Sequence, residues 1–309
     1  MKILLTGATG FLGSHVAELL CGEEYELLLV KRTCSKLDKC YAFGDNANVQ
    51  WINSDQQNWL NISIIFNPDV IIHCAWSGVN SYYRENLDVQ LSNMKLFSQL
   101  LYIAEKVSVN KFISLGSQAE YGQFEECIDE NYPVNPTTKY GIIKLTLLYM
   151  LKSFSLLHNI DWYWLRVFSI FGEREDDSWI LTSAIKRMLS GYMEMNFTKG
   201  EQVYSYLYVK DFANAINLIL KKKGESGIYN LSSSKHRKLK DILNHIKMQI
   251  NSECKLNFGI LPYRPNQSMY MGGDSSLFIK KFGDFETLNF EQHLYQLIEY
   301  YKKRRNEVV

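Results

Sequence analysis

The sequence predicts an α/β fold in which a doubly wound parallel sheet carries a smaller C-terminal lobe. The chain opens with an apolar strand, a glycine-rich turn and a helix within residues 2–20. Short apolar runs, typical of buried parallel strands, then alternate with helical segments as far as residue 167. From Gly172 onward the chain changes character, and we expect the lobe to begin there.

The alternating segments supply the other elements of the sheet and the lobe. Further strands are predicted at residues 25–30, 49–52, 70–74, 111–115, 161–167 and 227–231. Helices are predicted at residues 12–20, 85–107 and 212–222, after residue 140, and, in the lobe, at residues 178–191, 239–250 and 290–303. We therefore assign residues 1–171 and about 206–232 to the sheet domain, and residues 172–205 and 233–309 to the lobe.

The glycine-rich turn is the first chemical motif. Gly7-x-x-Gly10-x-x-Gly13 lies between a strand and a helix, which is the context that a dinucleotide-binding loop requires. Such a loop brings the backbone close to a pyrophosphate, and free N–H groups at the helix start bind the anion. The cofactor-binding residues expected here are Gly7, Thr9, Gly10, Phe11, Leu12 and Gly13. We therefore expect a Rossmann-type sheet.

A tyrosine and a lysine four residues apart form the second motif. Tyr140 and Lys144 fall in a predicted helix, so their side chains share one face. A phenol has an ordinary pKa of roughly 10, too high for an efficient proton shuttle near neutral pH. A lysine cation one turn away favours the phenolate and lowers that pKa. The pair is common by chance, so its meaning depends on the glycine loop.

Together these motifs resemble the extended short-chain dehydrogenase/reductase superfamily, and within it the NAD(P)-dependent sugar-nucleotide epimerase/dehydratase/reductase group. Residues 114–122 resemble the family's serine motif, in which the catalytic serine, here Ser117, precedes Tyr-Gly by four positions. The resemblance implies that Tyr140 donates a proton to a carbonyl oxygen and that Ser117 hydrogen-bonds the same oxygen. Lys144 would lower the pKa of the tyrosine and hold the nicotinamide ribose. The resemblance covers nearly the whole chain.

Lys31 and Arg32 bear on the choice of cofactor. They follow the second strand, where NAD-selective folds usually place an acidic residue for the ribose hydroxyls. Two cations suit a 2′-phosphate, so we expect NADP(H) to be preferred, with NAD(H) as the alternative. Two solvated charges at a strand end are the simpler explanation. The resemblance also implies that Asp55 binds on the adenine side of the cofactor and that Ala75 lies beside the cofactor. The alternative for Asp55 is an ordinary loop carboxylate.

The expected substrate contacts depart from the family pattern. Ser169 stands where the family has asparagine, and Tyr204 where many relatives have arginine. A tyrosine can stack on a base or sugar but cannot neutralise a phosphate. Arg264 is then the candidate for the diphosphate of a nucleotide-sugar substrate, because the guanidinium fork matches phosphate oxygens. The alternative is an ordinary surface arginine.

Composition excludes several classes of function. With 309 residues, 22% of them charged, and a formal net charge of +1, the chain gives no support for nucleic-acid or membrane-surface binding. We expect no apolar run approaching the roughly 20 residues of a membrane span, and no signal peptide. The six cysteines form no Cys-x-x-Cys, so no metal site is expected. We expect a cytoplasmic enzyme that forms a homodimer through a helix bundle.

Several reactions fit the implied triad. A dehydratase needs an acid and a base beside Ser117, but Gln118 and Ala119 occupy those positions. An epimerase recycles a tightly held NAD, which Lys31 and Arg32 disfavour, whereas a reductase consumes NADPH. The resemblance is closest to reductases of 4-keto-6-deoxy nucleotide sugars in surface-polysaccharide pathways, such as CDP-paratose and CDP-abequose synthases. A nucleotide-sugar 4-epimerase is the alternative. The second alternative is a non-catalytic NADP-binding regulator, but the intact triad favours an enzyme.

Overall fold

The computed structural model describes residues 1–309 except 24, 81, 265–266 and 308–309. Its centre is a seven-stranded sheet in the order β11-β7-β5-β4-β1-β2-β3, in which every neighbouring pair is parallel. The strands are β1 (Lys2–Thr6), β2 (Glu26–Lys31), β3 (Val49–Asn53), β4 (Val70–His73), β5 (Lys111–Ser117), β7 (Asp161–Val167) and β11 (Gly227–Leu231). The predicted doubly wound parallel sheet is confirmed, and its strand order reverses between β1 and β4.

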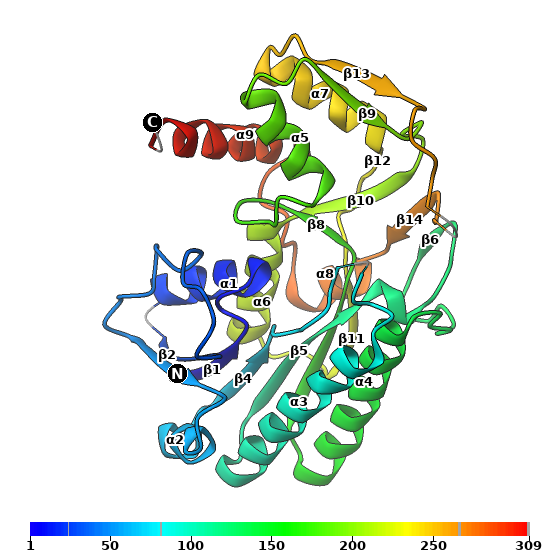
Figure 1. Ribbon diagram of the computed structural model, residues 1–309. Coiled ribbons are helices and arrows are strands. Elements are labelled where there is room, and N and C mark those ends of the chain that lie inside the picture. Colours follow the sequence, from blue (N-terminus) through cyan, green and yellow to red (C-terminus); the bar gives the residue numbers. More distant parts are fainter. Residues whose placement is uncertain (24, 81, 265–266, 308–309) are drawn as a thin grey trace.

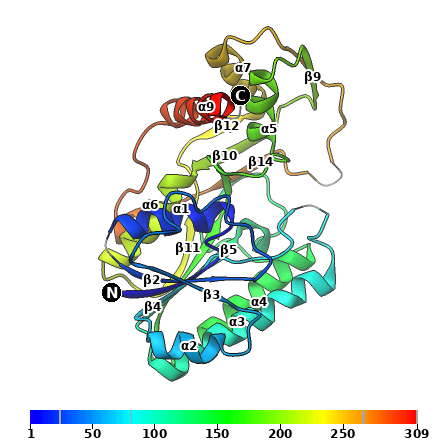
Figure 2. The ribbon, with the colours of Figure 1, turned by 60° about the vertical axis from the view of Figure 1, so that its left-hand side comes forward.

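Helices cover both faces of this sheet (Figures 1 and 2). One face carries α1 (Phe11–Gly22) and α6 (Val209–Lys221), and the other carries α2 (Trp59–Phe66), α3 (Leu87–Val107) and α4 (Lys139–His158). Alternate side chains of each strand point to opposite faces. Ile3 and Leu5 of β1 therefore join the core under α1, while Leu4 between them joins the core under α3 and α4.

The lobe is built around a smaller sheet and three helices. The sheet contains β6 (Cys127–Ile128), β8 (Ser169–Phe171), β10 (Val203–Tyr208), β12 (His236–Lys238) and β14 (Tyr270–Gly273). A separate parallel pair is formed by β9 (Glu194–Phe197) and β13 (Lys255–Phe258). The helices α5 (Ile180–Leu189), α7 (Leu239–Ile250) and α9 (Phe290–Glu307) share one apolar core.

One segment assigned to the lobe packs on the large sheet instead. Helix α8 (Ser276–Phe282) places Phe278 and Phe282 against Tyr229 of β11, with ring centroids 5.9 and 5.3 Å away. Both phenylalanines are fully buried and belong to the core under α1 and α6. The chain therefore returns to the large sheet once more before α9.

The structure contains elements that the sequence did not predict, and the predicted elements differ from the observed ones at their ends. The unpredicted elements are the helices α2 and α8 and the strands β6, β8, β9, β12, β13 and β14. Strand β5 continues to Ser117, because residues 115–117 pair in register with residues 165–167 of β7. Helix α3 begins at Leu87, because the Asn86 side chain caps it by accepting a hydrogen bond from the Val89 N–H at 3.1 Å. Helix α5 is shorter than predicted at both ends.

Helix α4 contradicts the prediction that no apolar run approaches the length of a membrane span. The helix has 20 residues, and a window of 18 of them has a mean hydropathy of 1.3, which is long and apolar enough to cross a membrane. Within the fold, however, the helix packs against α3, β5 and β7, and it buries Tyr140 and Lys144. A core helix of a soluble domain passes the same test of length and composition.

Candidate active site

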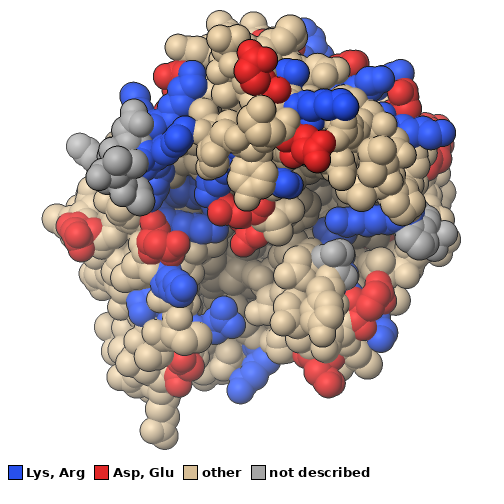
Figure 3. Space-filling view, turned by 45° about the horizontal axis from the view of Figure 1, so that its top comes forward, with Lys and Arg blue, Asp and Glu red and all other residues tan. Residues whose placement is uncertain are grey.

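A large cleft lies between the carboxyl ends of the parallel strands and the lobe. Its volume is about 2120 Å³, and it is lined by the glycine loop, by Ser117, Tyr140 and Lys144, and by residues of the lobe. Figure 3 shows one face of the molecule hollowed at its centre, with Lys and Arg side chains around the rim. Ligands bind at this edge of open α/β sheets.

The glycine loop has the geometry of a nucleotide cradle. Gly7 adopts a φ of +82°, and a Cβ there would lie 2.6 Å from the Ala75 backbone nitrogen. A Cβ on Gly13 would lie 2.2 Å from the Gly7 carbonyl oxygen. The loop therefore tolerates no side chain at either position, and it fits a bound dinucleotide. The residues predicted from the loop that line the cleft are Gly7, Thr9, Gly10, Phe11, Leu12 and Gly13.

Ser117, Tyr140 and Lys144 come together in the middle of the cleft. Ser117 ends β5, and Tyr140 and Lys144 lie one turn apart near the start of α4. All three are buried, with exposed fractions of 5%, 6% and 4%. The Ser117 hydroxyl lies close enough to the Tyr140 phenol to lower the pKa of the phenol. The structure thus places a proton donor and a hydroxyl beside each other at the edge of the sheet.

Lys144 is held tightly by its surroundings. Its Nζ donates a hydrogen bond of 2.6 Å to the Leu115 carbonyl oxygen and lies 3.6 Å from the centre of the Trp76 ring. Burial lowers the pKa of Lys144 from 10.5 to about 7, although the negative charge of Glu120 partly opposes this. An ammonium over an indole face is favoured, so Trp76 helps to keep the lysine charged. The sequence did not predict this role for Trp76.

The phenol of Tyr140 has a second cation beside it. The Arg84 guanidinium carbon lies 5.0 Å from the centre of the Tyr140 ring, and Lys144 Nζ lies 5.8 Å from it. Burial raises the pKa of Tyr140, whereas Arg84 and the Ser117 hydroxyl oppose this rise. The sequence predicted that Lys144 would lower the pKa of Tyr140, but this pKa is raised, and the cation that opposes the rise is Arg84. Arg84 lies in a loop far from the motifs, and nothing in its spacing pointed to Tyr140.

Glu120 fixes the end of β5. Its fully buried carboxylate accepts hydrogen bonds from the Ser117 N–H at 2.8 Å, from Trp164 Nε1 at 2.9 Å and from Arg166 Nε at 2.8 Å. Arg166 supplies the compensating charge. Because a buried charge is stable only when it is paired and hydrogen-bonded, this pair is a rigid support for Ser117. It was not predicted from the sequence.

The predicted cofactor residues at the adenosine end also line the cleft. Lys31 Nζ donates to Asn53 Oδ1 at 2.8 Å, and the Arg32 side chain is exposed. The Asp55 carboxylate accepts hydrogen bonds from the Thr33 N–H at 3.0 Å and from the Thr33 hydroxyl at 2.9 Å. These bonds lower the pKa of Asp55. Asp55 therefore anchors the turn that carries the two cations. Ala75 lines the cleft beside the glycine loop.

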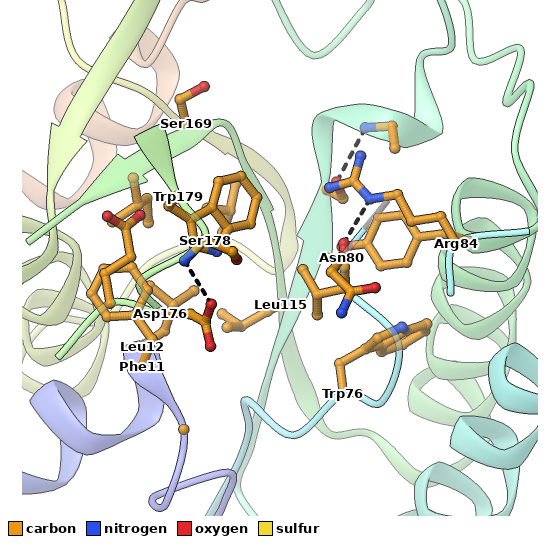
Figure 4. A pocket seen from close by; sticks show the side chains of 18 of the residues that line it. Phe11, Leu12, Trp76, Asn80, Arg84, Leu115, Ser169, Asp176, Ser178 and Trp179 are labelled. Atoms are coloured by element: carbon orange, nitrogen blue, oxygen red, sulfur yellow. Dashed lines mark hydrogen bonds between the residues drawn. The ribbon is translucent and has the colours of Figure 1, made fainter. Parts of the chain in front are cut away.

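The predicted substrate residues approach from the lobe. Ser169, Tyr204 and Arg264 all line the cleft. Tyr204 donates to the Ser268 carbonyl oxygen at 2.7 Å, while the Arg264 side chain is exposed. Figure 4 shows two sets of side chains that face each other across the cavity. These are Trp76, Asn80 and Arg84 on one side, and Ser169, Asp176, Ser178 and Trp179 on the other.

Solved structures with this fold include nucleotide-sugar epimerases. The chain aligns over 99% of its length with all of the UDP-glucose 4-epimerase from Thermotoga maritima, with a TM-score of 0.87 at 24% identity. It aligns over 98% of its length with all of the UDP-glucuronic acid 4-epimerase from Bacillus cereus, with a TM-score of 0.87 at 22% identity. That epimerase was solved with UDP-glucuronic acid and NAD.

Sequence comparison identifies the family. The dTDP-6-deoxy-L-talose 4-dehydrogenase (NAD(+)) of Aggregatibacter actinomycetemcomitans is 25% identical, covering 88% of this chain and 99% of the relative. The CDP-abequose synthase of Salmonella muenchen is 24% identical, and the alignment covers 96% of this chain and 97% of that relative. The model of the NAD dependent epimerase/dehydratase family matches residues 3–232. The chain therefore belongs to the NAD-dependent epimerase/dehydratase family, as its motifs predicted, and is an enzyme of that family.

Proposed function

We propose that the protein is an NADPH-dependent reductase of a 4-keto-6-deoxy nucleotide sugar. The observation that carries this is the buried group of Ser117, Tyr140 and Lys144, which stands in the cleft without an adjacent acid–base pair. Such a site interconverts a carbonyl and an alcohol, and the two positions after the serine, Gln118 and Ala119, supply no acid–base pair for dehydration. The likeness to CDP-abequose synthase supports a role in making a nucleotide sugar, and we place that role in the cytoplasm, in the synthesis of surface polysaccharides.

The residues divide the work of the reaction. When bound in this cleft, the nicotinamide supplies a hydride to the carbonyl carbon. Tyr140 donates a proton to the carbonyl oxygen, and Ser117 orients that oxygen by hydrogen bonding. Lys144 holds the nicotinamide ribose and keeps positive charge near the phenol. Ser169, Tyr204 and Arg264 lie on the lobe side of the cleft, where the nucleotide and its diphosphate would bind.

The proposed preference for NADPH rests on Lys31 and Arg32. Both line the cleft at the end of β2, where the adenosine ribose binds in this fold. Replacing both by alanine should weaken NADPH binding by about 2–3 kcal/mol, because hydrogen bonds to a charged phosphate are lost. Fluorescence titration measures this, with NADH binding to the same variant as the control. Equal or tighter binding of NADH by the unchanged protein overturns the preference.

A 4-epimerase is the second candidate, favoured by the fold shared with the UDP-glucose and UDP-glucuronic acid 4-epimerases. An epimerase would carry bound NAD when purified, and it would form product without net loss of NADPH. The test is the absorbance of reduced nicotinamide, with a 4-keto-6-deoxy nucleotide sugar made in situ by a dehydratase. Consumption of one NADPH for each product supports the reductase. Product formation without NADPH consumption supports the epimerase.

The same proposal includes a homodimer formed through α3 and α4. Ile142, Tyr149 and Leu156 are exposed on α4 at a spacing of seven residues, which places them along one stripe. Leu87, Leu91 and Tyr102 are exposed on the neighbouring α3. Two copies related by a twofold axis would cover this surface as a four-helix bundle.

A further inference from the structure

Arg84 is positioned on Tyr140 by its main chain as well as by its side chain. The Arg84 carbonyl oxygen accepts a 3.1 Å hydrogen bond from the Tyr140 N–H, one of the free N–H groups at the start of α4. The side chain then folds so that its guanidinium carbon lies 5.0 Å from the centre of the Tyr140 ring. Its Nε donates to the Val79 carbonyl oxygen at 2.8 Å, and the side chain lines the cleft (Figure 4).

Helix α3 fixes the loop that carries Arg84. The fully buried Gln90 accepts a hydrogen bond from Trp76 Nε1 at 3.0 Å and donates to the carbonyl oxygens of Gly78 and Tyr83, each at 2.9 Å. These three bonds tie both ends of the loop to one side chain. Arg84 is therefore presented by a defined structure, whereas an ordinary surface arginine would be free to turn away.

The ionisable groups that face Tyr140 come from three elements. Lys144 lies on α4 itself, Glu120 lies after β5, and Arg84 lies in the loop before α3. Lys144 is committed to Leu115 and Trp76, and burial weakens its hold on the proton. Glu120 has the opposite sign and disfavours the phenolate. Arg84 cannot deprotonate in a protein, so it is the cation whose charge persists at every working pH.

We propose that Arg84 is a positioning residue that acts through Tyr140, as the permanent cation that stabilises the phenolate formed during proton transfer. The proposal rests on the proposed role of Tyr140 as the proton donor. In the reaction, the carbonyl carbon is reduced by the hydride, its oxygen takes the Tyr140 proton, and the nicotinamide is oxidised. The phenolate left behind lies beside Arg84 until water returns a proton to it.

Three variants test the proposal. Arg84→Gln removes the charge, and Arg84→Lys keeps it. Lys139→Gln is the matched control, because Lys139 is adjacent to Tyr140 in the chain but is exposed and donates to the Glu85 carbonyl oxygen at 2.8 Å. Each protein is labelled with carbon-13 at the tyrosine ring carbon that bears the hydroxyl. The ionisation of Tyr140 is then followed by NMR, with Tyr140→Phe assigning the signal.

Arg84→Gln should reduce the ionisation constant of Tyr140 roughly tenfold, as expected for a charge removed a few ångströms away in a partly screened site. Arg84→Lys should restore most of the constant, and Lys139→Gln should leave it unchanged. An unchanged constant in a folded Arg84→Gln protein, checked by circular dichroism, overturns the proposal, as does failure of Arg84→Lys to rescue. The titration needs no sugar substrate, so a wrong substrate assignment cannot produce either result.

Discussion

Lys144 carries its charge in surroundings that disfavour it. Its side chain is 4% exposed, and its pKa falls from 10.5 to about 7 because burial removes hydration from the ammonium. The unfolded chain therefore binds this proton more tightly than the folded chain does. The loss in the free energy of unfolding caused by burying this charge is complete below about pH 7. It becomes smaller as the pH rises from about 7 towards 10.5. Lys144, which the proposed reaction requires, therefore lowers the stability of the fold.

Replacing Lys144 by methionine should therefore stabilise the protein while abolishing turnover. We expect a gain of about 1–4 kcal/mol in the free energy of unfolding at neutral pH, because a desolvated charged group is replaced by an apolar side chain of similar volume. Denaturant unfolding at several pH values measures this gain, which should shrink above pH 7 as the native lysine loses its proton. A variant less stable than the native protein at pH 7 would show that the contacts with Trp76 and Leu115 outweigh desolvation.

Tyr140→Phe tests the proton donor directly. The ring and its contacts with Trp76 and Arg84 are kept, so the unfolding midpoint and cofactor binding should change little. Turnover should fall by about 10²–10⁴-fold, the usual contribution of a positioned proton donor. Steady-state kinetics with the 4-keto substrate provides the measurement. Near-normal turnover would mean that another group in the cleft is the acid.

The sequence predicted the residues whose relation is set locally. Tyr140 and Lys144 are one helical turn apart, and the resemblance to the family's serine motif supplied Ser117, so the three could be grouped in advance. Arg84 and Glu120 could not be predicted, because their roles arise from tertiary contacts. Arg84 lies 56 positions before Tyr140, the tyrosine that it contacts.

At the scale of elements, the loop between β4 and α3 depends on one glutamine. Gln90→Leu should remove three hydrogen bonds and take these partners from the Trp76 N–H and the Gly78 carbonyl oxygen, while the Tyr83 carbonyl oxygen keeps the Asn86 N–H at 3.1 Å. We expect a loss of about 2–4 kcal/mol in stability and a change in tryptophan fluorescence as Trp76 moves. Ser98→Ala on the same helix is the control, because the Ser98 hydroxyl bonds only to the Lys95 carbonyl oxygen within the helix.

The strands of the large sheet were predictable, whereas their ends and the short strands of the smaller sheets were not. Apolar runs located every strand of the large sheet, because strands buried on both faces are nearly continuous in hydrophobicity. Their ends depend on partners instead. Ser117 extends β5 only because β7 provides pairing as far as Val167. The position of α8 beside β11 arises from Phe278 and Phe282, whose apolar character alone does not specify which core they join.

At the scale of the whole molecule, the proposed dimer makes a specific prediction. Leu156 and Leu157 are 79% and 80% exposed at the end of α4. Replacing both by aspartate should convert the dimer to a monomer, because charges would be buried in the bundle without partners. Sedimentation velocity measures the change. Ile65→Asp is the control, since Ile65 is also 80% exposed but lies on α2. A native protein that is monomeric throughout would contradict the proposal.

Helix α4 has a buried side and an exposed apolar side, and in the proposed dimer this would link assembly to turnover. Its inner side places Tyr140 and Lys144 in the cleft, while Ile142 and Tyr149 point outward. A partner subunit would hold the same helix from outside and so restrict the movement of the residues that transfer the proton. Specific activity should then fall when the enzyme is diluted below the dissociation constant of the dimer. Assays at very low enzyme concentration would underestimate the turnover of the assembled protein.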